Sequence, residues 1–455
     1  MAVLTAVAPV RDSFIANKKF GGVVTVRKSV YDMTADEVTA YRLAVDRIAK
    51  ISAQNVNDSR GYQTIAGVHG LPDNKCQHHN PAFALWHRPY VQNYEQRLQD
   101  AVPGTADKPG VYLPYWDWTT QRAKAEGIPQ IFLDPTWLNP DTNQTEPNPL
   151  ASQPVLVVPG HAPTRRNPRP PAELERFAGM VQNALRAPDY LAMTSDLEGP
   201  HGGVHMWIGG DMTDQNVAAF DPIFWSHHCF VEYVFCQWQD AHPEAIEPVI
   251  DTRRFSPYSV TVDKIWAYRS LGYAYQPDSG SHLTPSSLNL AGHAGGAAGE
   301  TGADGGLVSG ATVATFPMYY IIPDFDRAEV RFEGLTPPED SFEVRVFANQ
   351  PGADASTSIE DDNVHFLGSH FFFGHGDCVG APGHCHPTDR DIFDLRGAHH
   401  YAPVQVRVNV TRRLKRLIEK EHPADTPITL VAVDRDGVEL PCPGLHFEGF
   451  MIVVR

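Results

Sequence analysis

Six histidines in two clusters of three carry the most evident chemistry in this chain. The clusters are His69, His78 and His87, and then His201, His205 and His228. Three imidazoles can hold one metal ion and still leave positions open for a ligand. Two such clusters in one chain therefore predict a two-metal site. Imidazole suits copper, zinc, iron and nickel, so the histidines alone do not select the metal.

Helices are needed to aim these side chains at one point. His201 and His205 are four residues apart, so on a helix they share one face. A helix starting near Asp221 is expected to carry His228, and residues 173–193 are also expected to be helical. The first cluster is expected on two further helices, with His78 on the loop between His69 and His87. A four-helix bundle with inward-pointing histidines is an established way to hold a metal pair.

Composition narrows the classes of partner. The chain has 455 residues and a formal net charge of −17 at pH 7, which argues against nucleic acid and membrane surfaces as partners. No apolar run approaches the length of a membrane span, about 18 residues. The N-terminal segment lacks a basic start and a long apolar stretch, so no signal peptide is expected. These features predict a soluble, cytoplasmic protein.

The hydrophobic pattern changes along the chain. Residues 34–53 have helical spacing and a capping-box pattern at Thr34 and Glu37. Residues 278–311 are rich in Gly, Ala and Ser, as in a flexible connector. Beyond them, apolar and polar residues alternate as in antiparallel strands. We therefore expect an α plus β protein with a helical metal-binding domain (1–277), a Gly-rich linker or loop (278–312) and a β-sandwich (313–455).

Several short motifs resemble those of the type-three copper proteins, the family of tyrosinases, catechol oxidases and molluscan haemocyanins. The resemblance covers at least residues 60–240. The motifs that carry it are Gly67–Pro72 (GVHGLP), Cys76-x-His78, Trp86-His87-Arg88, Tyr115–Trp118 (YWDW), His201-x-x-x-His205 and Asp221–His228 (DPIFWSHH). The strand-rich tail is also similar, less specifically, to the C-terminal domain of haemocyanin units and latent tyrosinases.

The resemblance implies two copper ions and dioxygen as co-substrate. His69, His78 and His87 would hold the first copper, and His201, His205 and His228 the second. The neighbouring His79 and His227 would not be ligands. Cys76 precedes His78 by two residues, as in family members that join those side chains by a thioether. Phe224 matches an aromatic residue that packs over the copper pair.

Two further positions bear on the reaction implied by the family. Glu198 resembles a glutamate that holds a water and helps to deprotonate a phenol; its alternative is a solvated loop carboxylate. Gly202 replaces the Asn that follows the fourth histidine in many monophenol-oxidising members. This departure favours oxidation of o-diphenols over hydroxylation of monophenols. The expected activity is that of a tyrosinase or catechol oxidase on a small phenolic substrate.

A reversible dioxygen carrier is the main alternative, because haemocyanin units share every copper ligand. A zinc hydrolase has little support, since two all-histidine triads lack bridging carboxylates. An oxidase and a carrier differ in whether the C-terminal domain can be displaced from the site or caps it permanently. Residues 278–311 are the expected place of cleavage. Residues 370–373 (HFFF) could fill a phenol site. Alternatively, their alternate phenylalanines enter the sandwich core.

Two further predictions concern side-chain pairs. Arg88 and Asp221 are expected to form an ion pair between helices. Cys378 and Cys385, with His375, His384 and His386 nearby, could form a transient copper-loading site, a disulfide or free thiols; these three alternatives remain open.

Overall fold

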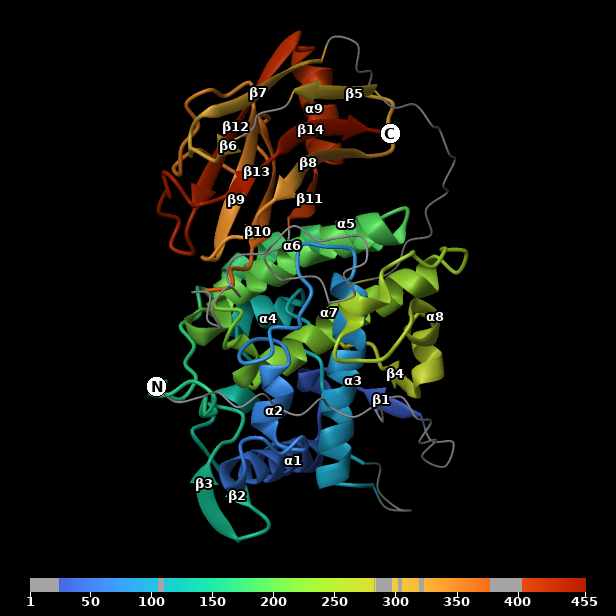
Figure 1. Ribbon diagram of the computed structural model, residues 1–455, viewed down its shortest axis with the longest axis vertical. Coiled ribbons are helices and arrows are strands. Elements are labelled where there is room, and N and C mark those ends of the chain that lie inside the picture. Colours follow the sequence, from blue (N-terminus) through green and yellow to red (C-terminus); the bar gives the residue numbers. More distant parts are fainter. Residues whose placement is uncertain are drawn as a thin grey trace.

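A helical part and a β-sandwich make up the protein (Figure 1). The computed structural model describes residues 24–104, 110–281, 283, 297–301, 305–318, 323–376 and 403–455. Its helical part contains α1 (Ala35–Gln54), α2 (Tyr62–Gly67), α3 (Phe83–Ala101), α4 (Gln121–Glu126), α5 (Glu175–Leu185), α6 (Tyr190–Ile208), α7 (Ile223–Ala241) and α8 (Val262–Ile265). Short strands accompany them: β1 (Thr25–Arg27) pairs with β4 (Tyr273–Tyr275), and β2 (Thr136–Asn139) with β3 (Gln144–Pro147).

The predicted capping box begins α1. The Thr34 hydroxyl accepts a hydrogen bond from the Glu37 N–H at 3.3 Å, and the Glu37 carboxylate accepts one from the Thr34 N–H at 2.8 Å. Apolar residues at helical spacing, among them Tyr41, Val45 and Ile48, form the buried face. That face supports the bundle in which α3, α6 and α7 lie almost entirely buried.

The segment predicted as one helix over 173–193 is divided. A 3-10 turn (Pro171–Leu174) leads into α5, and α6 begins only at Tyr190. Pro188 lacks the N–H that a continuing helix requires. The Asp189 side chain then accepts a hydrogen bond from the Ala192 N–H at 2.8 Å and caps the new helix.

Two four-stranded antiparallel sheets form the sandwich, as predicted. The first has the order β10-β9-β12-β7 and the second the order β11-β8-β14-β5. Their eight strands are β5 (Ala297–Thr301), β7 (Thr312–Pro317), β8 (Ala328–Leu335), β9 (Phe342–Ala348), β10 (Phe366–Phe372), β11 (Val404–Asn409), β12 (Asp425–Val433) and β14 (Gly449–Val454). A separate two-stranded sheet pairs β6 (Gly305–Gly306) with β13 (His446–Phe447). Helix α9 (Thr411–Glu421) packs Leu414, Leu417 and Ile418 into the same core.

Part of the segment predicted as a linker is strand. Residues 297–301 pair with β14, with Ala297 opposite Val454, and residues 305–306 pair with β13. Strand pairing is made by backbone groups, so a Gly- and Ala-rich run can still join the edge of a sheet. The domain limits at 277 and 313 remain a prediction.

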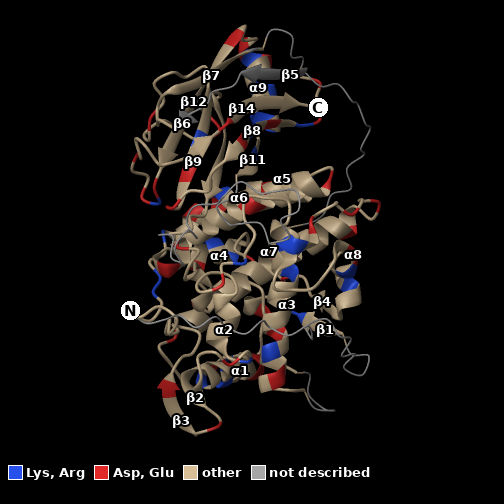
Figure 2. Ribbon diagram, in the orientation of Figure 1, with Lys and Arg blue, Asp and Glu red and all other residues tan. Residues whose placement is uncertain are grey.

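The two parts meet along α5 and α6. Acidic and basic residues are spread over both parts, including this seam (Figure 2). Arg327 from β8's N-terminal side donates to both carboxylate oxygens of Asp196 on α6, at 2.9 and 2.7 Å, and both side chains are buried. Asn409 donates to the same carboxylate at 3.0 Å. Removing one partner of a buried ion pair typically costs about 3–5 kcal/mol because the other charge is left unpaired, so loss of Arg327 or of Asp196 alone should weaken the docking of the sandwich on α6.

Among the helices of the described ranges, none is both long and apolar enough to cross a membrane.

Candidate metal centre

All six predicted histidines converge at one buried point inside the helical part. His87 lies on α3, His201 and His205 on α6, and His228 on α7. His78 lies on the loop before α3, as predicted, but His69 follows the end of α2 rather than lying on it. The Nε2 atom of His228 is 3.3 Å from that of His201 and 3.2 Å from that of His205. Ligand atoms of His69, His87 and His228 also lie within 4.8 Å of one another, so the two clusters adjoin.

Backbone carbonyls fix the orientation of three of these rings. The Nδ1 atoms of His69, His87 and His205 face the carbonyl oxygens of Gln215, Phe83 and Met212 at 3.3, 2.8 and 2.8 Å. A ring whose Nδ1–H is held in this way presents Nε2 to a metal. Among the described residues, the Nε2 atoms of His69 and His87 have no other hydrogen-bond partner.

Burial also keeps the imidazoles neutral. It lowers the pKa of His87 and of His205 to about 3, and it lowers the pKa values of His69, His201 and His228 well below the usual value. Neutral imidazole is the form that binds a metal. Two adjoining triads of neutral, oriented nitrogen donors without a carboxylate among them fit a pair of copper ions.

Each cluster has a second histidine beside a predicted ligand. His227 lies next to His228, and its Nδ1 atom accepts a hydrogen bond from the Trp118 indole at 3.1 Å. The rings of both His227 and His228 lie against His201 and His205, but the His228 ring also stacks on His87, with the centroids 4.6 Å apart. His79 adopts a left-handed backbone conformation (φ 55°), which turns it toward the seam with the sandwich. The ligand atoms of His227 nonetheless lie in the same group as those of His201, His205 and His228, within 4.8 Å of one another, so the choice of ligand within each pair stays a prediction.

Phe224 packs directly on the centre, as predicted. Its ring stacks on His228 with the centroids 4.0 Å apart, and it meets His69 edge-on at 4.8 Å. It lies one helical turn before His228 on α7. The ring therefore both shields the centre from water and fixes the plane of two imidazoles.

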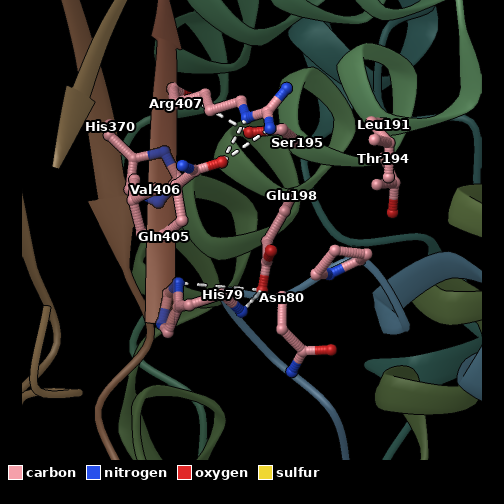
Figure 3. Close-up of a pocket in the computed structure, with 11 residues that line it drawn as sticks. His79, Asn80, Leu191, Thr194, Ser195, Glu198, His370, Gln405, Val406 and Arg407 are labelled. Atoms are coloured by element: carbon pink, nitrogen blue, oxygen red, sulfur yellow. Dashed lines mark hydrogen bonds and ion pairs between the residues drawn. The ribbon is translucent and has the colours of Figure 1, made fainter. Parts of the chain in front are cut away.

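Glu198 lies at the base of a cavity of about 50 Å³ between the two parts (Figure 3). Its carboxylate accepts a hydrogen bond from the His79 N–H at 2.5 Å. Burial raises the pKa of Glu198 to about 8, although the hydrogen bond lowers it. Burial beneath the sandwich therefore favours the protonated form of Glu198. It is a buried group, not a solvated loop carboxylate.

Gly202 lies beneath the sandwich. A Cβ atom at this position would lie 2.8 Å from the carbonyl oxygen of Phe371, closer than real Cβ contacts allow. The glycine thus permits strand β10 to approach α6. This packing role is independent of any role in orienting a water.

We predict that Gly202→Ala and Gly202→Asn both weaken the docking of the sandwich. Alanine improves helix propensity by about 1 kcal/mol, but overpacking costs about 1–3 kcal/mol, so the melting temperature of the full chain should fall. For the oxidation of o-diphenols that the resemblance implies, the expected result is a higher rate with catechol in both variants than in the wild-type chain.

Only the asparagine variant should also raise the ratio of monophenol to diphenol turnover. The alanine variant is the matched control, because it adds the Cβ atom without an amide. An unchanged ratio in the asparagine variant would remove position 202 from the control of monophenol oxidation.

Cys76 lies beside the first cluster. Its Sγ atom and the ligand atoms of His69 and His78 fall within 4.8 Å of one another. The side chain is buried and forms no disulfide with another cysteine of the described residues. The two side chains that the spacing predicts to form a thioether, Cys76 and His78, therefore lie close together. Cys378 and Cys385 lie outside the described residues, so their three alternatives remain predictions.

We expect copper-loaded, air-exposed protein to contain the Cys76–His78 bond. The peptide that holds both residues should then be lighter by two hydrogens and should resist alkylation at Cys76, both measured by mass spectrometry. Protein kept free of copper serves as the control and should be alkylated at Cys76 after unfolding. A fully alkylatable Cys76 in the copper-loaded sample would refute the cross-link.

The phenylalanines of residues 371–373 enter two different cores. Phe372 belongs to the sandwich core, whereas Phe371 and Phe373 belong to the core of the helical part. Phe372 thus enters the sandwich core as one alternative expects, while filling of a phenol site by its neighbours stays a prediction. The Phe373 ring stacks on His205 with the centroids 4.2 Å apart and also meets His78 at 5.3 Å and His201 at 6.0 Å. The C-terminal part therefore covers the centre.

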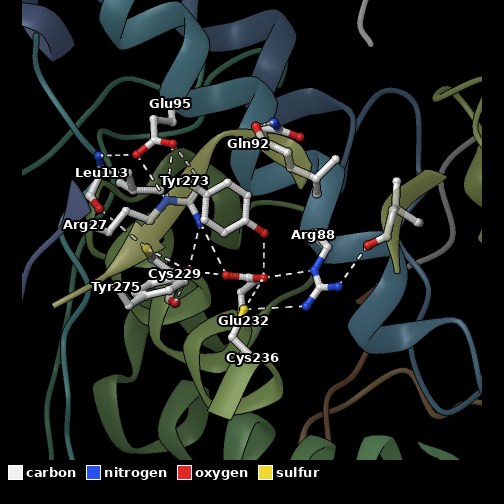
Figure 4. Close-up of polar contacts among 12 residues, drawn as sticks. Arg27, Arg88, Gln92, Glu95, Leu113, Cys229, Glu232, Cys236, Tyr273 and Tyr275 are labelled. Atoms are coloured by element: carbon white, nitrogen blue, oxygen red, sulfur yellow. Dashed lines mark hydrogen bonds and ion pairs between the residues drawn. The ribbon is translucent and has the colours of Figure 1, made fainter. Parts of the chain in front are cut away.

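The predicted ion pair between Arg88 and Asp221 is wrong. Arg88 bonds instead to Glu232, with Nε and Oε1 2.9 Å apart (Figure 4), and Asp221 is bound by Arg166. Glu232 also contacts Arg27 at 3.3 Å. Burial raises the pKa of Glu232, but the two arginines together lower it by more, so the net shift is downward. Glu232 lies one turn beyond His228, so this pair joins α3 to α7 behind the centre.

Comparisons with known proteins agree with this geometry. A family model described as the common central domain of tyrosinase matches residues 59–241. Tyrosinase from Streptomyces glaucescens is 31% identical over 241 residues, which are 48% of this chain and 84% of that protein. Hemocyanin 2 from Megathura crenulata is 26% identical over 341 residues, covering 64% of this chain and 9% of that protein.

A solved structure shares the whole fold. A functional unit from octopus hemocyanin superposes with a TM-score of 0.61 at 20% identity, covering 94% of this chain and 99% of that chain. The chain belongs to the type-three copper family. It spans less than a tenth of the length of the first haemocyanins that it matches.

Proposed function

We propose that this protein is a copper-dependent polyphenol oxidase that converts o-diphenols to o-quinones. Two diphenols would lose two electrons and two protons each, and one dioxygen would be reduced to two waters. The two copper ions, when bound, would supply the electron transfer to dioxygen. His69, His78 and His87 would hold one ion and His201, His205 and His228 the other.

The residues around the centre would bind and orient the substrate. The buried space over His205 that Phe373 now fills has the aromatic character that a phenol ring requires. Phe224 and the surrounding apolar residues exclude water. Glu198 is our candidate to take up a phenol proton. It would do so more readily once displacement of the sandwich exposes it to water, because hydration lowers the pKa of a buried carboxyl.

The position of Phe373 is the observation that carries this proposal. A phenylalanine ring stacked on a ligand histidine occupies the place that a substrate ring would take. It implies a closed form in which phenols are excluded. We propose that the C-terminal sandwich is an intramolecular cap, and that its displacement activates the enzyme.

A dioxygen carrier is the second candidate, favoured by the completeness of this cover and by the haemocyanin relatives. Oxygen uptake with catechol distinguishes the two. Copper-loaded protein should be measured before and after limited proteolysis that separates the cap. An oxidase should consume dioxygen continuously after cleavage, whereas a carrier should bind it once and release it when dioxygen is removed.

A further inference from the structure

Gln215 joins the cap to the first histidine cluster. Its backbone N–H donates to the Gly374 carbonyl at 3.1 Å, and its own carbonyl faces the His69 Nδ1 atom at 3.3 Å. Its side-chain amide contacts the Cys76 Sγ atom at 2.9 Å and the His375 Nδ1 atom at 2.8 Å. The residue is 1% exposed. One buried residue therefore touches both parts of the molecule through its backbone and again through its side chain.

The neighbouring residue repeats this arrangement. The Asn216 side chain donates to the His375 carbonyl. The Asn216 carbonyl accepts from the Leu71 N–H at 2.9 Å, two residues after His69. We call Gln215 and Asn216 the 215–216 junction. Its two ends hold residues 69–71 of the helical part and residues 374–375 of the cap.

The cap side of the junction is tied to the ring that covers the centre. His375 lies two residues after Phe373, and its N–H donates to the Pro338 carbonyl within the sandwich at 3.2 Å. Displacing Phe373 must therefore pull on His375 and on the Gln215 amide. The other side of the junction sets the Nδ1 partner of His69 and the position of Cys76, which precedes His78 by two residues.

We propose that Gln215 is a positioning residue that couples closure of the cap to the geometry of the first histidine cluster. With the cap closed, His375 fixes the Gln215 amide, which holds Cys76 beside His78, while the Gln215 carbonyl orients His69. With the cap displaced, the amide loses a partner and the first cluster loosens. None of the described contacts of Gln215 involves a histidine of the second cluster. The proposal rests on the proposed function only in treating His69 and His78 as metal ligands.

Polar chemistry explains why this contact can transmit a change. A buried donor or acceptor that loses its partner destabilises the closed state and so favours local opening. Exchanging the oxygen and nitrogen of the Gln215 amide would keep both contacts, because a thiol and an imidazole can each donate or accept a hydrogen bond. Both neighbours are therefore satisfied by an amide at 215, and neither would be by an apolar side chain.

The reactivity of Cys76 measures this coupling without copper. In metal-free full-length protein, alkylation of buried Cys76 requires local opening. We expect His375→Leu to raise its alkylation rate about tenfold, the effect of about 1.4 kcal/mol. His375→Asn should restore a rate near that of the wild type, because its amide can replace Nδ1 as a partner. Gln215→Met should behave like His375→Leu.

Other residues provide internal controls. Cys229 and Cys236 are buried on α7 and should keep their wild-type rates in each variant. His365→Leu is the matched control in the sandwich, since His365 contacts Glu421 and the Ala348 carbonyl in its own half. An unchanged Cys76 rate in His375→Leu would overturn the proposal. So would equal increases at Cys76, Cys229 and Cys236, which would indicate general destabilisation.

Copper binding supplies the second measurement. Copper ions added to the metal-free protein in competition with a chelator should bind with two affinities, of which His375→Leu weakens one by about tenfold and His375→Asn neither. Two unchanged affinities beside a raised Cys76 rate would overturn the link to the histidine cluster. Failure of the protein to oxidise phenols would contradict the proposed function but would leave both measurements intact.

Discussion

Catechol oxidation by the full-length protein is expected to rise about 10- to 100-fold when Phe373 is replaced by alanine. The Phe373 ring occupies the space over His205, so its removal clears the substrate position. It also weakens closure, because the buried contact of this ring with the helical part is lost. The measurement is the initial rate of oxygen uptake by copper-loaded protein.

Graded variants test the same idea. Phe373→Leu keeps an apolar but smaller cover and should give an intermediate rate. Phe366→Leu, on the same strand but in a separate cluster with Phe347, should leave the rate unchanged. If Phe373→Ala binds two copper ions and dioxygen yet oxidises no phenol, the protein is a carrier rather than an oxidase.

Loss of a single histidine of the proposed ligand set should abolish dioxygen binding. Losing only a hydrogen-bond partner of a metal ligand typically costs about 10- to 100-fold in metal affinity or activity, and losing the ligand itself should cost more. His228→Ala leaves one copper with two imidazoles. Metal analysis and oxygen uptake together report the loss of copper and of activity.

The neighbouring histidines make this prediction specific. His227→Asn keeps an acceptor for the Trp118 indole and should retain both copper ions, with activity within about tenfold of the wild type. His79→Ala should likewise retain both ions. If His227→Asn loses one copper while His228→Ala retains two, the assignment within that pair must be exchanged.

Much of the metal centre could be predicted from the sequence because its parts are local. The spacing of His201 and His205 on one helix, the capping box at Thr34, and the alternation in β9 and β12 depend on nearby residues. The prediction for Arg88 failed because its partner is chosen by helix packing: Arg88 reaches Glu232, a turn beyond His228, while Asp221 faces Arg166. The positions of these residues along the chain do not indicate which of them will form ion pairs.

The residues between the two parts of the molecule were the hardest to predict. Gln215 lies in an irregular segment between short 3-10 turns, and nothing in its neighbourhood of the sequence marks it as a contact of His69. Helix α9 was also missed, although Leu414, Leu417 and Ile418 have helical spacing, because the strong alternation on either side favoured strands. The sequence alone shows at Gly202 only that the asparagine of many monophenol-oxidising members is absent. Its contact with Phe371 depends on a strand about 170 residues away.

The alternation of Phe371, Phe372 and Phe373 has a consequence for the fate of the separated pieces. The end of β10 and the residue after it contribute to two hydrophobic cores. Phe372 lies inside the sandwich, whereas Phe371 and Phe373 lie inside the helical part. After cleavage and separation, the sandwich would carry Phe371 and Phe373 on a bare outer face at the edge of its sheet. Such an edge favours pairing with other chains. The released cap should therefore aggregate, and this removal from solution would make activation irreversible.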